Sequence, residues 1–185
     1  MARTRTKKGA ILEAAKRELL QHGYRRASID AIARTAGIAK GTVYVYFESK
    51  EEVFRELTRM LIAETMEQTR KAAEAPEPIA ERLALMLEAR FGLAHSIASS
   101  SPFGAELIDS SRSVCGDLWK KADQAWVSRV AKTLGELELA VSHREAAELL
   151  KRSARGTGFD EPISSALLKR RFRGLTSALL FGLRR

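Results

Sequence analysis

A short run of residues near the N-terminus carries side chains that suit contact with a polyanion. Four of them are polar or aromatic and follow one another at two-residue intervals: Lys40, Thr42, Tyr44 and Tyr46. If the run is helical, Val43 and Phe47 lie four residues apart on one inward face, which leaves these four side chains largely outside. Lysine pairs with phosphate or guanine, hydroxyl groups bond phosphate oxygens, and aromatic rings pack on thymine methyl groups. The run is therefore predicted to contact phosphates and base edges.

The residues before and within this run predict two short helices joined by a glycine turn. Ser28 is a favourable N-cap, and Asp30 places a negative charge in the first helical turn. The apolar residues that follow recur at helical spacing, and Gly37 comes where a left-handed residue commonly ends a helix. Gly41 has no Cβ, so the backbone of the second helix, at about residues 39–47, can approach a groove closely.

This stretch resembles the N-terminal DNA-binding domain of the TetR family of bacterial transcriptional regulators, over roughly residues 10–54. The resemblance rests on the pattern G-x-x-x-G-T-x-Y-x-Y-F from Gly37 to Phe47 and on the S-K-E-E sequence that starts at Ser49. Ala39 departs from it, since many members have a serine there as the cap of the recognition helix. The resemblance implies a helix-turn-helix that enters the major groove. The residues expected to contact double-stranded DNA, the first two from a basic N-terminal arm, are Arg3, Arg5, Ser28, Ala39, Lys40, Gly41, Thr42, Tyr44, Tyr46 and Lys50.

The distribution of charge along the chain supports the same interpretation independently. Residues 1–50 hold eleven Lys and Arg against four Asp and Glu, a net charge of +7, whereas the whole chain of 185 residues carries +9. Concentrated positive charge is what phosphate contacts need for affinity. A merely solvated basic surface would show the same count, but here the charge coincides with the motif.

Composition bounds the class of protein and its compartment. With 45% hydrophobic and 30% charged residues the chain is ordinary for a soluble helical protein, and no apolar run reaches the roughly 18 to 20 residues of a membrane span. The single cysteine, Cys115, rules out an intrachain disulfide and is expected in the core. We expect a cytoplasmic bacterial protein that associates with the nucleoid and not with a membrane.

Catalytic and cofactor-dependent functions find little support in the sequence. The three histidines, His22, His95 and His143, are far apart and show no metal-ligand spacing. There is no G-x-S-x-G pattern and no P-loop, and the glycines at 156 and 158 lack the rest of a dinucleotide fingerprint. We expect no enzymatic activity, no cofactor and no metal.

Helical periodicity runs through the whole chain, without sustained two-residue alternation, and predicts an all-α fold. The expected organisation is a three-helix helix-turn-helix DNA-binding domain at residues 1–50 and a helical effector-binding and dimerisation domain at residues 51–185. Ser49 with Glu52 forms a capping box that predicts a long fourth helix. Further helix ends or starts are expected at Gly23, Pro76–Pro78, Ser99–Pro102, Ser113–Gly116, Ser142, Gly156 or Gly158, and Pro162.

The last helix carries a stripe of large apolar residues and a stripe of small ones. Gly in a helix interior costs about 0.5 to 1 kcal/mol relative to Ala, so Gly174 and Gly182 suggest close approach of another helix. TetR-family regulators commonly dimerise through their last two helices as a four-helix bundle, and the resemblance implies the same here; packing within one chain is the alternative. The expected interface residues are Leu149, Leu150, Ser153, Leu167, Phe172, Gly174, Leu175, Ala178, Leu179 and Gly182.

Large apolar and aromatic residues gather in the middle of the sequence, where an effector pocket is expected. Arg90 and His95 could orient a polar group of a ligand. Each candidate also has an ordinary structural role, since aromatics at helical spacing are usually core and a lone histidine is more often satisfied locally. The expected site for a small apolar or amphipathic effector comprises Met86, Arg90, Phe91, His95, Phe103, Trp119 and Trp126.

Taken together, these features predict a dimeric, sequence-specific DNA-binding regulator: a repressor that a small effector releases from a pseudo-palindromic operator. Two heads are needed because one short recognition helix contacts few base pairs. Effector binding would move the fourth helix, change the separation of the two recognition helices and weaken DNA binding. The alternative keeps the DNA-binding head but gives the C-terminal domain a protein partner or a DNA-organising role, without a small effector.

Overall fold

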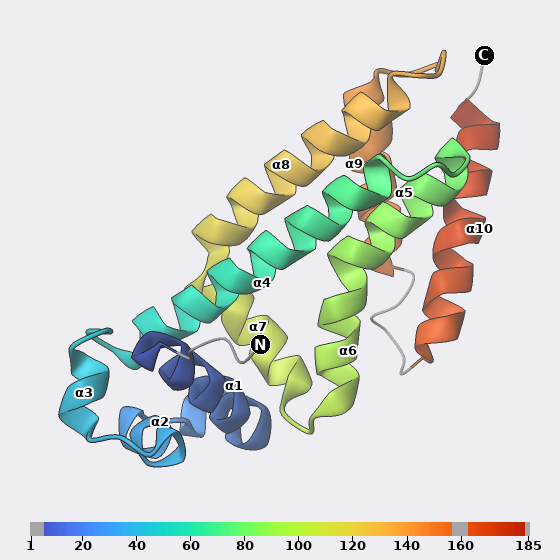
Figure 1. Cartoon of the computed structure of the whole chain (residues 1–185). Helices are drawn as coiled ribbons and strands as arrows, with labels where there is room; N and C mark the ends of the chain where they lie inside the picture. Colours follow the sequence, from blue (N-terminus) through green and yellow to red (C-terminus); the bar gives the residue numbers. More distant parts are fainter. Residues whose placement is uncertain (1–5, 157–162, 184–185) are drawn as a thin grey trace. The chain divides into compact units, whose positions relative to one another are not determined.

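The computed structural model describes residues 6–156 and 163–183, and over these residues the chain is helical, as expected for the all-α class (Figure 1). The elements are α1 (Lys7–Arg26), α2 (Ile29–Ala36), α3 (Lys40–Tyr44), α4 (Lys50–Ala73), α5 (Ile79–Leu87), the π-helical turn η1 (Glu88–Gly92), α6 (Leu93–Ser100), α7 (Gly104–Val114), α8 (Gly116–Leu134), α9 (His143–Gly156) and α10 (Ser165–Leu183). They form two compact units. Unit 1 comprises Met1–Leu61 and Ile97–Leu118, and unit 2 comprises Ile62–Ser96 and Trp119–Arg185. The functional division at residue 50 stays a prediction.

Local hydrogen bonds set the helix boundaries in unit 1 where the sequence predicts them. The hydroxyl of Ser28 accepts from the N–H of Ala31 at 3.1 Å and caps α2, which ends at Gly37 with a φ of 70°. The hydroxyl of Ser49 accepts from the N–H of Glu52 at 3.1 Å at the start of α4. Gly23 adopts a non-helical conformation (φ 77°, ψ 167°), so the expected stop is a sharp break before the last turn of α1.

The helices of the head, α1 to α3 and the start of α4, lie together (Figure 1), and they pack around one small apolar core. Its buried side chains include Ile11 from α1, Ile32 from α2, Val43 from α3 and Val53 from α4. Because every one of these helices contributes to the core, the short α3 is held against the other three. This packing fixes which side of α3 faces solvent.

Unit 2 has a larger core, formed mainly by α5, α8, α9 and α10. α10 packs along α5 (Figure 1). Trp126 and Phe172 are fully buried there, and Phe91 from η1 lies against both, with ring centroids 6.3 and 6.2 Å away. The π-helical turn was not predicted: the expected single helix from Pro78 to Ser99 is interrupted at η1.

Two other helix boundaries differ from the expectation. α3 covers only five residues, Lys40–Tyr44, and ends before the expected Phe47, where the N–H of Tyr46 donates to the carbonyl of Val43 at 3.0 Å in a tighter three-residue turn. α10 starts at Ser165, where the hydroxyl of Ser164 accepts from the N–H of Leu167 at 3.2 Å. The expected start at Pro162 lies outside the described residues.

Candidate nucleic-acid interface

α3 is fixed to the head by the two side chains that the sequence places on its inward face. Val43 and Phe47 are 0% and 2% exposed. The N–H of Thr42 donates to the carbonyl of Ala39 at 2.9 Å, and the N–H of Phe47 donates to the carbonyl of Val43 at 3.0 Å. These contacts hold one side of the helix inward, so the other side is presented to solvent.

The outward side of α3 is open and mixes polar with apolar groups. Lys40 and Gly41 are exposed, and a Cβ added at Gly41 would meet nothing within 4 Å. Three consecutive large side chains follow with high exposed fractions: Tyr44 at 49%, Val45 at 77% and Tyr46 at 38%. Such a surface offers an ammonium group, phenol hydroxyls and apolar area together, with room for close backbone approach.

Lys40 is not free in this structure. Its ammonium donates to a carboxylate oxygen of Asp30, in the first turn of α2, at 2.9 Å, and both side chains are exposed. This hydrogen bond and the negative charge of Asp30 raise the pKa of Lys40 above its ordinary value. Asp30 therefore holds Lys40 and partly neutralises it until a stronger anion competes.

The sequence of this head matches a known family. The description "Bacterial regulatory proteins, tetR family" belongs to the profile that matches residues 11–57, which include α2 and α3 entire. The head, over residues 11–57, thus resembles the DNA-binding domains of the TetR family. The match covers the helix-turn-helix segment that such regulators use to bind DNA.

Two curated relatives come from Bacillus subtilis. The uncharacterized HTH-type transcriptional regulator YhgD is 42% identical over 72 residues, which is 39% of this chain and 36% of the relative. The fatty acid metabolism regulator protein is 30% identical over 93 residues, which is 50% of this chain and 48% of the relative. Each match therefore spans less than half of the relative's own length.

A solved structure extends the likeness to the whole chain. SmeT, the repressor of the Stenotrophomonas maltophilia multidrug efflux pump SmeDEF, superposes with a TM-score of 0.70 over 98% of this chain and 92% of its own. Sequence identity is 19%, so the match shows that the two proteins share the TetR-family fold and no more.

Lys50, expected to contact a phosphate, is engaged within the head. Its ammonium donates to the carbonyl of Tyr24 at 2.9 Å and to that of Arg25 at 3.4 Å, and it lies 4.6 Å above the centre of the Tyr24 ring. Two of its three N–H groups are thereby used on the end of α1. The side chain ties α4 to the joint between α1 and α2.

The same joint is held from its other side by a residue that the sequence analysis missed. A carboxylate oxygen of Glu106, on α7, accepts from the N–H of Arg25 at 3.1 Å. The carboxylate lies where a side chain at Gly23 would be, because a Cβ added there would come within 2.4 Å of it. Glu106 is 81 residues away from Arg25, and no local pattern in the sequence predicts such a contact.

The remaining expected DNA-contact residues lie as follows. Ser28 uses its oxygen as an acceptor for the α2 cap, which leaves its O–H free to donate to a phosphate. Thr42 is half-buried at the side of α3, and Ala39 is exposed just before it. Arg3 and Arg5 lie outside the described residues.

The expected effector residues divide between the two units. Met86, Phe91 and Trp126 are buried together in unit 2, where the indole N–H of Trp126 donates to the carbonyl of Met86 at 3.3 Å. His95 is also buried. Phe103 belongs to unit 1, where the guanidinium of Arg26 lies 5.9 Å from its ring centre.

Arg90 is the charged member of the expected effector site. It pairs with Asp123, which also accepts from Arg155 at 2.9 Å, and its guanidinium lies 4.8 Å from the ring centre of Trp119. The Nε of Arg90 and the indole nitrogen of Trp119 are buried and have no hydrogen-bond partner among the described residues. Arg90 and Arg155 thus share the carboxylate of Asp123, and the two N–H donors of Arg90 and Trp119 have no acceptor among the described residues.

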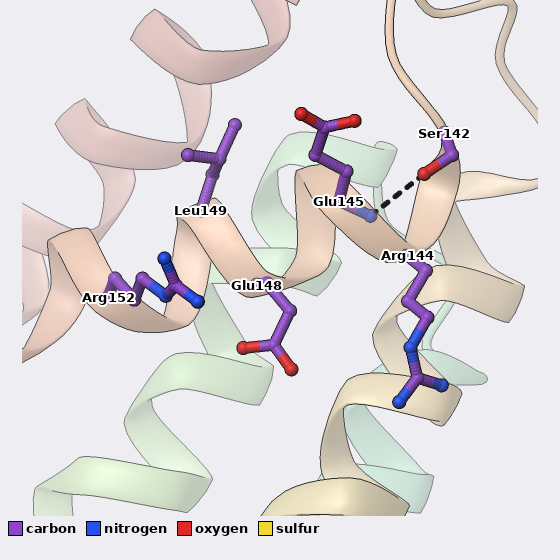
Figure 2. Close-up of a pocket in the computed structure, with 6 residues that line it drawn as sticks. All are labelled: Ser142, Arg144, Glu145, Glu148, Leu149 and Arg152. Carbon is purple, nitrogen blue, oxygen red and sulfur yellow. Dashed lines mark hydrogen bonds between the residues drawn. The ribbon is translucent and has the colours of Figure 1, made fainter.

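A hollow of about 370 Å³ lies on the outer face of α9 (Figure 2). Figure 2 shows its six lining residues: Ser142, Arg144, Glu145, Glu148, Leu149 and Arg152. The hydroxyl of Ser142 accepts from the N–H of Glu145 at 3.2 Å, which is the predicted cap of this helix. All six residues come from α9 and its cap, and most are charged, so the hollow differs from the apolar enclosure that an effector needs.

The expected interface residues differ widely in exposure. Leu149 and Leu167 are 40% and 37% exposed, and Ser153, Gly174, Ala178 and Gly182 are exposed as well. Leu150 and Phe172 are fully buried in the core of unit 2, so they offer no surface to a second chain and are removed from the expected interface. Leu175 and Leu179 are half-buried against the same core. Phe181, which the sequence analysis did not select, is 89% exposed.

The part of the chain that the structure describes holds no group of three or more His, Cys, Asp or Glu residues that could bind a metal ion. None of its helices is long and apolar enough to cross a membrane. The single cysteine, Cys115, is buried between α7 and α8, and desolvation raises the pKa of its thiol.

Proposed function

We propose that this chain is a homodimeric transcriptional repressor that binds a pseudo-palindromic operator in double-stranded DNA and leaves it when a small apolar or amphipathic effector binds. The outward side of α3 carries this proposal. It is an exposed surface of a strongly basic head, and it combines the ammonium of Lys40 with the hydroxyls of Tyr44 and Tyr46. Such a protein would act on the nucleoid, in the cytoplasm.

The proposed DNA contacts follow from the geometry of α2 and α3. α3 would lie in the major groove, and the O–H of Ser28 would donate to a phosphate at the N-terminus of α2, where backbone N–H groups also favour an anion. Lys50 has one N–H group left for a phosphate after its two bonds to carbonyls. Its larger role would be to hold the joint that positions α2.

The proposed dimer uses the exposed faces of α9 and α10. Leu149 and Leu167 are large apolar residues left exposed in the single chain, and Gly174 and Gly182 present backbone with open space beside it. Burying apolar surface against close-packed backbone is the usual basis of a helix–helix interface. Two heads on a two-fold axis would then match two half-sites of an operator.

The effector proposal rests on unit 2 and on the names of two similar proteins. One of them is named a fatty acid metabolism regulator, and the other, SmeT, is the repressor of a multidrug efflux pump. In this chain Met86, Phe91 and Trp126 would supply apolar contact, while Arg90 and Trp119 have donors to spare for a polar group. Residues 1–50 would bind DNA, and residues 51–185 would bind the effector and dimerise.

Selection of operators from random DNA with the purified chain tests the proposal. The expected result is one enriched sequence with two-fold symmetry, bound by two chains as measured by sedimentation of the complex. Enrichment of no sequence, or of an asymmetric half-site bound by one chain, would contradict it.

Effector binding needs a separate experiment. A panel of medium-chain fatty acids and cationic dyes is titrated into the chain–operator complex, with Arg90→Met as the test variant and Arg112→Met, a change at an exposed arginine of α7, as its matched control. The effector site is supported if one class of compound releases the wild-type protein and the Arg112→Met variant from DNA but releases the Arg90→Met variant less effectively. Lack of release by every compound favours the alternative, in which unit 2 answers to a protein partner or organises DNA.

A further inference from the structure

The outer surface of α3 concentrates exposed apolar area. Seven large hydrophobic side chains are exposed among the described residues, and three of them are consecutive: Tyr44, Val45 and Tyr46. Val45 is the most exposed of the three, at 77%. Scattered exposed hydrophobics are ordinary, but three in sequence on a basic head indicate a surface that is covered in the working state.

Val45 occupies the centre of this surface. Val43 is fully buried, and two residues along a helix turn the side chain by about 200°, so Val45 points away from the core. Its backbone continues the helix (φ −65°, ψ −27°), and its N–H donates to the carbonyl of Gly41 at 3.2 Å. Gly41 therefore lies one turn earlier on the same outward ridge, where the absence of a Cβ leaves the backbone open.

The polar side chains of α3 flank this ridge instead of forming its centre. Lys40 and Tyr44, four residues apart, share one side, and Thr42 and Tyr46 share the other. A helix in the major groove points its central ridge at base edges, while its flanks face the two sugar–phosphate backbones. The hydroxyl and ammonium groups thus lie where phosphates would be, and Gly41 and Val45 lie where base edges would be.

Valine can recognise only one group on the floor of the major groove. It has no hydrogen-bond donor or acceptor, and the C5 methyl group of thymine is the apolar group that protrudes from the base edges into the major groove. An apolar side chain against a polar edge would leave that edge without its hydrogen bonds. Valine is also stiff at χ1, so little side-chain entropy is lost when it is fixed.

We infer that Val45 is a specificity-determining residue that packs on the C5 methyl group of one thymine in each operator half-site. This inference rests on the proposed function, in which α3 enters the major groove. It assigns sequence selection at that base pair to an apolar contact and leaves Lys40, Tyr44 and Tyr46 as phosphate contacts that add affinity.

Replacing thymine by deoxyuridine tests the contact, because this change removes only the methyl group. On the selected operator, each thymine is replaced in turn, together with its symmetry mate, and binding is measured for the wild-type chain, for Val45→Ala and for Val114→Ala. The last variant makes the same change in α7 of unit 1, away from α3. Burial of one methyl group corresponds to about fourfold in affinity for each half-site.

The expected result is a single symmetric pair of thymines whose replacement weakens wild-type and Val114→Ala binding by roughly 16-fold, two fourfold effects together. Val45→Ala binds the normal operator more weakly and is insensitive to replacement at that pair. If no thymine is sensitive, or if Val45→Ala keeps the wild-type sensitivity, the inference is overturned while the operator and the proposed function stand. If the selection enriches no operator, both are overturned.

Discussion

The outer sides of α3 and α10 both expose a large apolar side chain near glycine, but the side chains around it differ. Each exposes one large apolar side chain almost completely, Val45 at 77% and Phe181 at 89%, close to glycines whose missing Cβ would meet nothing within 4 Å. Beside Val45 are an ammonium and hydroxyl groups. Beside Phe181 the exposed neighbours include small Gly and Ala residues.

This difference separates two uses of open backbone. A glycine among polar side chains allows a polyanion to come close while the flanking groups bind its phosphates. A glycine among small and apolar side chains allows another helix to come close, and the gain comes from buried apolar area. The comparison supports the proposal that α3 contacts DNA and α10 contacts a second copy of the chain, and the following predictions test each part.

The largest effect is expected from filling the open backbone of α10. Gly174→Leu and Gly182→Leu fit the single chain, since a Cβ at either position meets nothing, and leucine favours the helix by about 0.5 to 1 kcal/mol over glycine. Against a partner helix the same side chain would overpack by about 1 to 3 kcal/mol, which is roughly 5- to 150-fold in dimerisation. Sedimentation should show monomers, while thermal unfolding of the monomer shifts upward.

Gly116→Leu is the matched control for these variants. Gly116 is also an exposed helical glycine with open space around its Cα, at the start of α8. It should gain stability without loss of the dimer. Dimers of native strength in both α10 variants would transfer the interface to the other exposed face, that of α9.

The next effect concerns the flanks of α3. Lys40→Ala and Tyr44→Ala should each weaken operator binding by about tenfold for each half-site, because a hydrogen bond to a charged group contributes about 1.5 kcal/mol. The loss should be equal across operator variants, unlike the loss in Val45→Ala, since phosphates are the same at every base pair. Binding titrations on a panel of single-base operator variants measure this, with Lys132→Ala on α8 as the control. Full affinity in both variants would remove α3 from the interface.

A smaller effect is expected at Lys50, and it separates two roles for that residue. Lys50→Met breaks the bonds to the carbonyls of Tyr24 and Arg25, and a net 0.5 to 1.5 kcal/mol corresponds to about 2- to 10-fold in affinity. If Lys50 mainly positions α2, the slope of log affinity against log salt stays unchanged. If it neutralises a phosphate, the slope falls by about 0.9 for each half-site. Lys16→Met, at an exposed lysine of α1, provides the baseline.

Most of the fold was predictable because its determinants are local. The cap at Ser28, the left-handed Gly37 and the capping residue Ser49 each act within a few residues, and all three appear where the sequence places them. The π-helical turn at Glu88–Gly92 was not predicted, since it depends on how that helix packs in unit 2 and leaves no periodic pattern of its own.

The candidate site was predictable in part, for a similar reason. Helical spacing alone places Val43 inward and Tyr44 outward. Lys50 and Glu106 both bind the backbone at the joint between α1 and α2. Glu106 lies 81 positions from Arg25, and no rule of residue spacing predicts a contact over such a distance in sequence. Phe172 was misplaced because a stripe of leucines and a phenylalanine looks the same whether it faces a core or a partner.

The smallest expected effect is a gain in DNA affinity, and it tests whether Asp30 restrains Lys40 on α3. Asp30→Asn removes the acid that holds Lys40 at 2.9 Å and raises its pKa. The ammonium stays protonated near pH 7 without it, since the ordinary pKa of lysine is far higher. Releasing Lys40 and removing a negative charge beside the proposed phosphate path should strengthen binding by about two- to fivefold, and more at low salt.

Asp30→Asn is also expected to destabilise the fold, and thermal unfolding measures this loss separately from the gain in binding. Asp30 is also the acid in the first turn of α2, so its loss should lower the free energy of unfolding by about 0.3 to 1 kcal/mol. A protein that is less stable yet binds DNA more tightly shows that the Asp30–Lys40 pair restrains the surface of α3. Asp109→Asn, at an exposed acid on α7, controls for the general loss of one negative charge. Weaker binding by Asp30→Asn would instead mean that Asp30 orients Lys40 for contact and that the pair works as one unit on DNA.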